Sequence, residues 1–191
     1  MFNKEKKANS NLLSSQPTGI LVFENGLSIP AIGIGHKGHS VGEICFNTSM
    51  TGYQEIITDP SYSDQIITFT FPHIGNVGTN FEDIESEKIW LKGVVFAKEI
   101  TEPSNYRSFE KLNLWLEKNQ IVGVAGVDTR AITKLIRTRG ALKATIVNGD
   151  IADTEKYLEE CKNWPGLKGM ELTKKVTTQQ IYNWNDERLW S

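Results

Sequence analysis

The sequence contains few of the residues that build disulfide frameworks or metal centres. It has two cysteines, Cys45 and Cys161, and three histidines among 191 residues. Two cysteines cannot form a disulfide framework, so their number gives no indication of secretion. Cys45 lies in an apolar stretch typical of a strand, and Cys161 follows Tyr157 and Leu158 at helical spacing. Both are therefore interpreted as small buried thiols.

The three histidines, His36, His39 and His73, have no cysteine or carboxylate at metal-ligand spacing beside them, which disfavours a metal site. A nucleophilic pair of Cys45 and His73 would require a contact that no spacing in the sequence indicates. Residues 73–79 form a glycine-containing stretch, but it lacks the lysine and the following serine or threonine of a P-loop. We expect its glycines to serve tight backbone turns.

The sequence also lacks a surplus of one charge and a long apolar run. Lysine and arginine number 21 against 23 acidic residues, a formal net charge of -2, whereas nucleic acids and acidic membranes call for a concentrated basic face. The longest apolar-plus-glycine run, residues 121–127, is too short to cross a bilayer. Residues 1–16 lack the apolar core of a signal peptide. We therefore expect a cytoplasmic protein with no nucleic-acid or membrane partner.

What the sequence does contain is a composition typical of a soluble globular protein, with 39% hydrophobic and 23% charged residues. Its length suits one domain with additional segments, or two very small domains. We predict a disordered tail over residues 1–18 and a domain over 19–163. Residues 164–191 hold three of the five tryptophans, Trp164, Trp184 and Trp190, without convincing periodicity, so this segment is expected to pack on something outside the domain.

The first half of the domain has the pattern of a strand-rich structure. Asn25-Gly26 is a strong hairpin signal between strands at 19–23 and 27–34, and Pro30 in the second of these predicts an edge position or a bulge. Gly33, Gly35 and Gly38 predict a loop. Between Met50 and Pro60 we expect a helical turn, closed by Asp59-Pro60. Further strands are predicted over residues 41–48, 65–71 and 89–97.

The second half alternates helices with strands. Ser108 is expected to cap a helix with Phe109, Leu112, Trp115 and Leu116 inward, and a strand follows over 121–127. Asp128 is expected to cap a second helix, which ends before Gly140. A strand at 142–147 and a helix at 153–162 complete the domain. The pattern predicts an α/β or α+β domain in which helices pack on a mixed sheet, and we favour α/β.

Residue chemistry alone identifies no catalytic centre in this chain. The helix start at Asp128-Thr129-Arg130 could attract an anion, but helix capping explains Asp128 fully. A weaker hypothesis is an anion-binding protein that uses this helix start. A titration with phosphate that shows no binding would exclude it.

Several long, ordered blocks resemble the small subunit of carbamoyl-phosphate synthase. The blocks are FNTSMTGYQEIITDPSYS (residues 46–63), QIITFTF (65–71), PHIGNVGTN (72–80), GVDTRAITKLIR (126–137) and PGLKGM (165–170). They occur in the family's order, and the resemblance runs from about residue 19 to the end. It implies that 19–163 is the family's N-terminal domain, a swivelling β/β/α fold, and that 164–191 is a linker and the start of a class I glutaminase domain that is missing from this chain.

The family resemblance also implies a function. Glutamine is hydrolysed by a cysteine thiolate in the glutaminase domain, and ammonia passes to the large synthetase subunit. That subunit uses ATP and Mg to make carbamoyl phosphate from bicarbonate, for arginine and pyrimidine synthesis. Neither Cys45 nor Cys161 matches the family's Gly-x-Cys-x-Gly setting. We therefore expect this chain to lack a catalytic residue, metal and cofactor of its own, and to be inactive alone.

One functional residue of the family corresponds to a residue here. Ser61, the first serine of Asp-Pro-Ser-Tyr-Ser, matches the position that binds substrate glutamine across the domain boundary. From the residues alone, the start of a turn after Pro60 is the better explanation of Ser61, and only the resemblance favours the binding role. The expected partners are glutamine and the large subunit. The alternative is a stand-alone, non-catalytic interaction or regulatory module that reuses this domain as a scaffold.

Overall fold

The computed structural model describes residues 16–178, 180 and 181. The tail predicted over 1–18 lies almost entirely outside these residues, as do Trp184 and Trp190. No helix in the described ranges has the length and apolar character needed to span a membrane.

Within the described residues, seven strands close into a barrel in the order β1-β2-β6-β5-β4-β3-β7. Neighbours from β3 through β4 and β5 to β6 are parallel, and the remaining pairs are antiparallel. The predicted mixed sheet is therefore confirmed, but its closure into a barrel was not predicted. The strands are β1 (Gly19–Phe23), β2 (Ser28–Gly35), β3 (Gly38–Asn47), β4 (Gln65–Phe69), β5 (Gly93–Val95), β6 (Val122–Ala125) and β7 (Leu142–Asn148).

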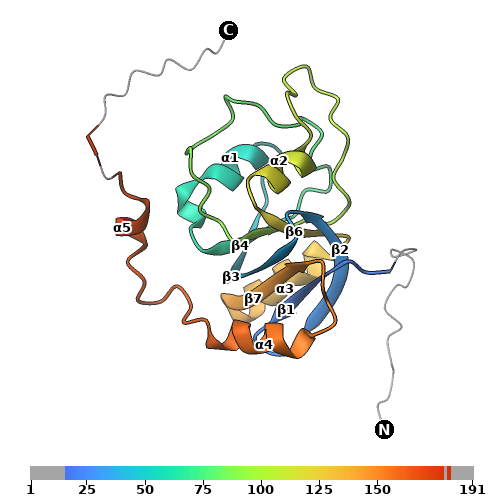
Figure 1. Cartoon of the computed structure of the whole chain (residues 1–191), viewed down its shortest axis with the longest axis vertical. Coiled ribbons are helices and arrows are strands. Elements are labelled where there is room, and N and C mark those ends of the chain that lie inside the picture. Colours follow the sequence, from blue (N-terminus) through green and yellow to red (C-terminus); the bar gives the residue numbers. More distant parts are fainter. Residues whose placement is uncertain (1–15, 179, 182–191) are drawn as a thin grey trace.

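The helices surround the barrel on different sides (Figure 1). The short α1 and α2 lie together at one end of the view, α4 lies at the other end, and the chain then runs out to α5 at the side. The helices are α1 (Tyr53–Thr58), the 3-10 turn η1 (Pro60–Tyr62), α2 (Leu112–Lys118), α3 (Thr129–Arg139), α4 (Thr154–Asn163) and α5 (Leu172–Val176). The sequence pattern did not predict α5.

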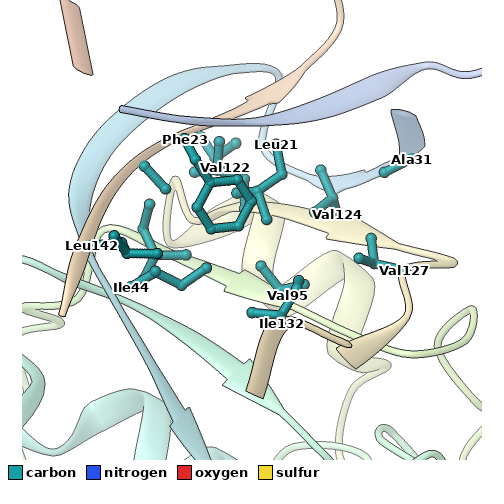
Figure 2. Close-up of a cluster of buried hydrophobic side chains, with 13 residues drawn as sticks. Leu21, Phe23, Ala31, Ile44, Val95, Val122, Val124, Val127, Ile132 and Leu142 are labelled. Atoms are coloured by element: carbon teal, nitrogen blue, oxygen red, sulfur yellow. The ribbon is translucent and has the colours of Figure 1, made fainter. Parts of the chain in front are cut away.

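The barrel interior is filled mainly by alternating strand residues, joined by Val127 and by Ile132 of α3 (Figure 2). Leu21 and Phe23 of β1 point into it, while Ile20 and Val22 face outward and pack against Tyr157 of α4. This two-residue period explains why one strand contributes to two apolar layers. A third cluster lies beneath α1 and α2, where Phe69 and Phe96 meet edge to face at 5.4 Å between ring centroids.

The predicted start of α2 at Ser108 is wrong. The helix begins at Leu112, and Phe109 is 71% exposed instead of facing inward. The backbone N–H of Phe109 donates to the carbonyl of Thr79, and Thr79 and Glu110 form an isolated β-bridge. This long-range pairing holds the segment extended, so the helical spacing around Phe109 is not realised.

The loop predicted from Gly33, Gly35 and Gly38 is also wrong. Gly33 and Gly35 belong to β2, and Gly38 begins β3, which leaves only a two-residue turn. A Cβ at Gly33 would lie 2.0 Å from the side-chain Oδ1 of Asn148, so this glycine permits close packing inside a strand.

The predicted strand boundaries differ mainly where the chain leaves the barrel. β4 ends at Phe69 rather than at residue 71, and only Gly93–Val95 of the predicted strand 89–97 forms β5. Pro30 pairs across from Ile20 of β1, and the β2–β6 pairing begins only at Ile32. On its other side, Pro30 has no partner in β6, so its missing N–H interrupts no hydrogen bond of the sheet, as expected for an edge position.

Candidate functional site

Ser61 lies in the short turn η1 that precedes β4. Pro60 opens this turn, and the Asp59 carboxylate accepts a hydrogen bond from the Ser61 N–H at 2.8 Å. The side-chain amide of Gln65 donates to the Ser61 carbonyl at 3.2 Å. The backbone of Ser61 is thus held on both sides, while the residue itself is exposed. Its hydroxyl is presented to solvent from a fixed turn.

The neighbouring Tyr62 connects this turn to the end of β3. The Asn47 side-chain amide donates to the Tyr62 hydroxyl at 3.0 Å, and its carbonyl oxygen accepts from the N–H of Ser49 at 2.7 Å. The loop after β3, which carries the 72% exposed Met50, is therefore fixed relative to the Ser61 turn.

Asp64 joins the Ser61 turn to the segment that follows the barrel. Its buried carboxylate lies 3.2 Å from the ammonium of Lys92 and also pairs with Lys175 of α5. Burial alone would raise the pKa of this carboxyl, but hydrogen bonds from Lys175 and Lys92 outweigh burial and lower that pKa below its usual value. The charged pair brings α5 to a residue only three positions from Ser61.

The two thiols are not placed for nucleophilic catalysis. Burial, followed by the charge of Glu43, raises the pKa of Cys45 to about 12. Burial is also the main cause that raises the pKa of the Cys161 thiol to about 11. Thiolate is the reactive form of cysteine, so neither thiol is suited to attack a substrate. Cys161 is buried as predicted, whereas Cys45 is only partly buried.

The histidines occupy separate environments. His39 Nε2 lies 2.9 Å from a Glu160 carboxylate oxygen, and its ring packs beside Tyr157. His73 packs edge to face against Phe71 instead of contacting Cys45. Among the described residues, no group of three or more histidine, cysteine or acidic side chains is arranged to hold a metal ion.

The glycine-containing stretch 73–79 packs as a structural loop. The buried Tyr53 hydroxyl donates to the Gly78 carbonyl at 2.5 Å, and a Cβ at Gly78 would lie 2.0 Å from the Ser108 hydroxyl. The predicted role of these glycines in tight turns is confirmed for Gly75 and Gly78, which both have positive φ.

Asp128 caps α3 as predicted, because its carboxylate accepts a hydrogen bond from the Ala131 N–H at 2.9 Å.

A hollow of about 740 Å³ lies between α3 and the residues that follow β3 and β4. It contains three cationic side chains and does not include Ser61. Sequence analysis did not identify it, although the absence of acidic residues from 129–139 was a visible signal.

Comparison with known proteins identifies relatives over most of this chain. Residues 21–146 match the family model described as carbamoyl-phosphate synthase small chain, CPSase domain. The carbamoyl phosphate synthase small chain of Bradyrhizobium diazoefficiens is 50% identical over 182 residues, which cover 92% of this chain and 46% of that protein. The corresponding protein of Yersinia pseudotuberculosis is 49% identical over 167 residues, covering 87% and 43%.

The match to solved structures is slighter. An aminopeptidase from Aneurinibacillus sp. strain AM-1 aligns with a TM-score of 0.41 and 13% identity, over 71% of this chain and 31% of that one. This similarity is too low to indicate a shared fold or function. The sequence relatives are decisive, and this chain spans less than half of their length. The chain belongs to the carbamoyl-phosphate synthase small chain family, of which it contains the N-terminal CPSase domain.

Proposed function

We propose that this chain is the N-terminal part of the glutamine amidotransferase subunit of carbamoyl-phosphate synthase. In this proposal, the domain, of the swivelling β/β/α type, provides one wall of a glutamine pocket and a docking face for the large synthetase subunit. The cysteine that attacks glutamine belongs to a downstream glutaminase segment. The large subunit, in the cytoplasm, consumes the ammonia with ATP and Mg to form carbamoyl phosphate.

The observation that carries the proposal is the position of α5 beside the Ser61 turn. Lys175 of α5 pairs with Asp64, which places α5 next to a residue three positions from Ser61. This position of α5 supports a pocket shared by the Ser61 turn and a following domain.

Ser61 suits recognition of the glutamine α-carboxylate. A hydroxyl can donate a hydrogen bond to a carboxylate, and a bond to a charged group contributes roughly 1.5–3 kcal/mol. The turn fixes the Ser61 backbone through Asp59 and Gln65, which reduces the entropy lost when the substrate binds.

The proposal is tested with the complete small subunit assembled with its large subunit. Ser61→Ala is expected to raise the glutamine KM by roughly tenfold or more, because binding energy to the substrate carboxylate is lost. Synthesis from added ammonium should be unchanged, since it bypasses glutamine. Ser104→Ala, which removes a hydroxyl from an exposed loop, is the matched control. An unchanged glutamine KM in Ser61→Ala would remove this residue from the site.

A further inference from the structure

Helix α3 concentrates positive charge in a chain whose net charge is -2. The helix contains Arg130, Lys134, Arg137 and Arg139 and no acidic residue. Arg130, Lys134 and Arg137 follow the i, i+4, i+7 spacing, which places them along one side of a helix. At 1.5 Å per residue this row is about 10 Å long.

The three aligned cations line the hollow beside the barrel. Its other wall includes Thr48 and Thr70, which directly follow β3 and β4. The Thr70 hydroxyl donates to the Asn47 carbonyl at 3.2 Å. The Thr133 and Thr138 hydroxyls, also in the hollow, donate to helix carbonyls at 2.8 Å. These three hydroxyl protons are already used, so the groups left to contact a ligand are the cations and the hydroxyls of Thr48 and Thr129.

Some basic residues around the barrel are paired with a carboxylate, and these three cations are not among them. Lys92, Arg107 and Lys118 each pair with a carboxylate. Within the described ranges, no carboxylate lies at ion-pair distance from the cationic groups of Arg130, Lys134 or Arg137. The nearest acidic residue in sequence, Asp128, is engaged in capping the helix. Three exposed like charges in a row repel one another, and an acidic ligand would relieve that repulsion.

We propose that this hollow docks an acidic segment of a partner protein, whose carboxylates meet Arg130, Lys134 and Arg137. A single phosphate would not span the row of about 10 Å, whereas successive acidic side chains of a polypeptide would. The identity of the partner rests on the proposed function, under which it is the large synthetase subunit.

The test measures binding of the 191-residue chain to purified large subunit at 50 and 300 mM KCl. The variant R130Q/K134Q/R137Q is expected to bind at least tenfold more weakly at 50 mM, and to show a smaller loss of affinity at 300 mM, because fewer charge contacts are screened. The matched control is K37Q/K156Q/K162Q. It removes the same charge from residues near the opposite end of β3 and from α4, and it should bind within twofold of the unmodified chain.

The outcomes separate this inference from the proposed function. Equal affinity of the α3 variant and the unmodified chain overturns the docking site while leaving the large subunit as the partner. Equal weakening of both triple variants would show a general charge effect and also overturn the site. Failure of the unmodified chain to bind overturns the docking inference, and the glutamine KM of Ser61→Ala then decides the proposed function separately. Circular dichroism and thermal unfolding establish that the variants are folded.

Discussion

Asp64 connects α5, near the end of the described residues, to the barrel. Its φ of 58° lies in the left-handed region, which aspartate and asparagine tolerate better than most residues. Its carboxylate contacts lysines from two segments far apart in sequence, Lys92 before β5 and Lys175 in α5. This one side chain therefore combines a local backbone role with a long-range electrostatic one.

We expect Asp64→Asn to lower the free energy of unfolding at pH 7 by about 1–2 kcal/mol, a modest value because both lysines are partly exposed. Asparagine retains the backbone preference, so the loss reports the charge. The folded pKa of Asp64 is lowered, so its stabilisation is present above the unfolded carboxyl pKa of about 3.9. It disappears as the pH falls through the folded pKa.

Urea unfolding of the unmodified chain and of Asp64→Asn between pH 7 and pH 3 measures this difference. The difference between the two free energies should shrink as the pH falls below about 3.9. Glu87→Gln, at an exposed carboxylate, serves as the control and should follow the unmodified chain throughout. A constant difference between Asp64→Asn and the unmodified chain across the pH range would refute the electrostatic explanation.

At the scale of elements, Asn148 at the end of β7 holds the turn between β2 and β3. Its side-chain amide donates to the carbonyls of Ile34, Gly35 and His36 at 3.0, 3.1 and 3.0 Å. Gly33 leaves space for this side chain. Since β7 also pairs with both β1 and β3, the asparagine secures the tight turn at the place where the barrel closes.

Replacing Asn148 with alanine is expected to destabilise the protein by about 1–3 kcal/mol, because buried carbonyls lose their donor. Asn148→Asp should be worse than Asn148→Ala, since a carboxylate of similar size would face three carbonyl oxygens and offer no donor when ionised. Thermal or urea unfolding at pH 7 ranks the two variants. The opposite order would show that side-chain volume, rather than hydrogen bonding, governs this position.

At the scale of the whole molecule, the domain presents two separate surfaces on a closed barrel. The Ser61 turn precedes β4, whereas Thr70 in the α3 hollow follows it. Neither surface contains a reactive thiol, because Cys45 lies on β3 and Cys161 is buried in α4. Under the two proposals, the described domain would supply binding surfaces, while neither of its thiols is suited to act as the nucleophile.

The 191-residue chain alone is accordingly expected to release no ammonia from glutamine. The raised pKa of Cys45, to about 12, and that of Cys161, to about 11, leave very little thiolate at neutral pH. A coupled ammonia assay measures this, with the complete small subunit as the positive control. Ammonia release by the chain that is abolished by Cys45→Ser or Cys161→Ser would contradict the expectation.

Local sequence signals determined much of the secondary structure. Asn25-Gly26 gave the hairpin between β1 and β2, Asp128 and Gly140 bound α3, and Asp59-Pro60 closed α1. Each of these signals acts through the conformation or hydrogen bonding of its immediate neighbours. The family could also be inferred from the sequence, because its motifs are long and occur in order.

Only the tertiary structure decided the barrel closure, the extended path around Phe109 and the pairing of Asp64 with Lys175. Each depends on contacts between residues far apart in the chain, whose free energy overrides local preference. The α3 hollow arises for the same reason, since the helix and the ends of β3 and β4 meet only after folding. The sequence by itself thus determined the local elements and the family, while long-range packing decided which exposed side chains share a surface.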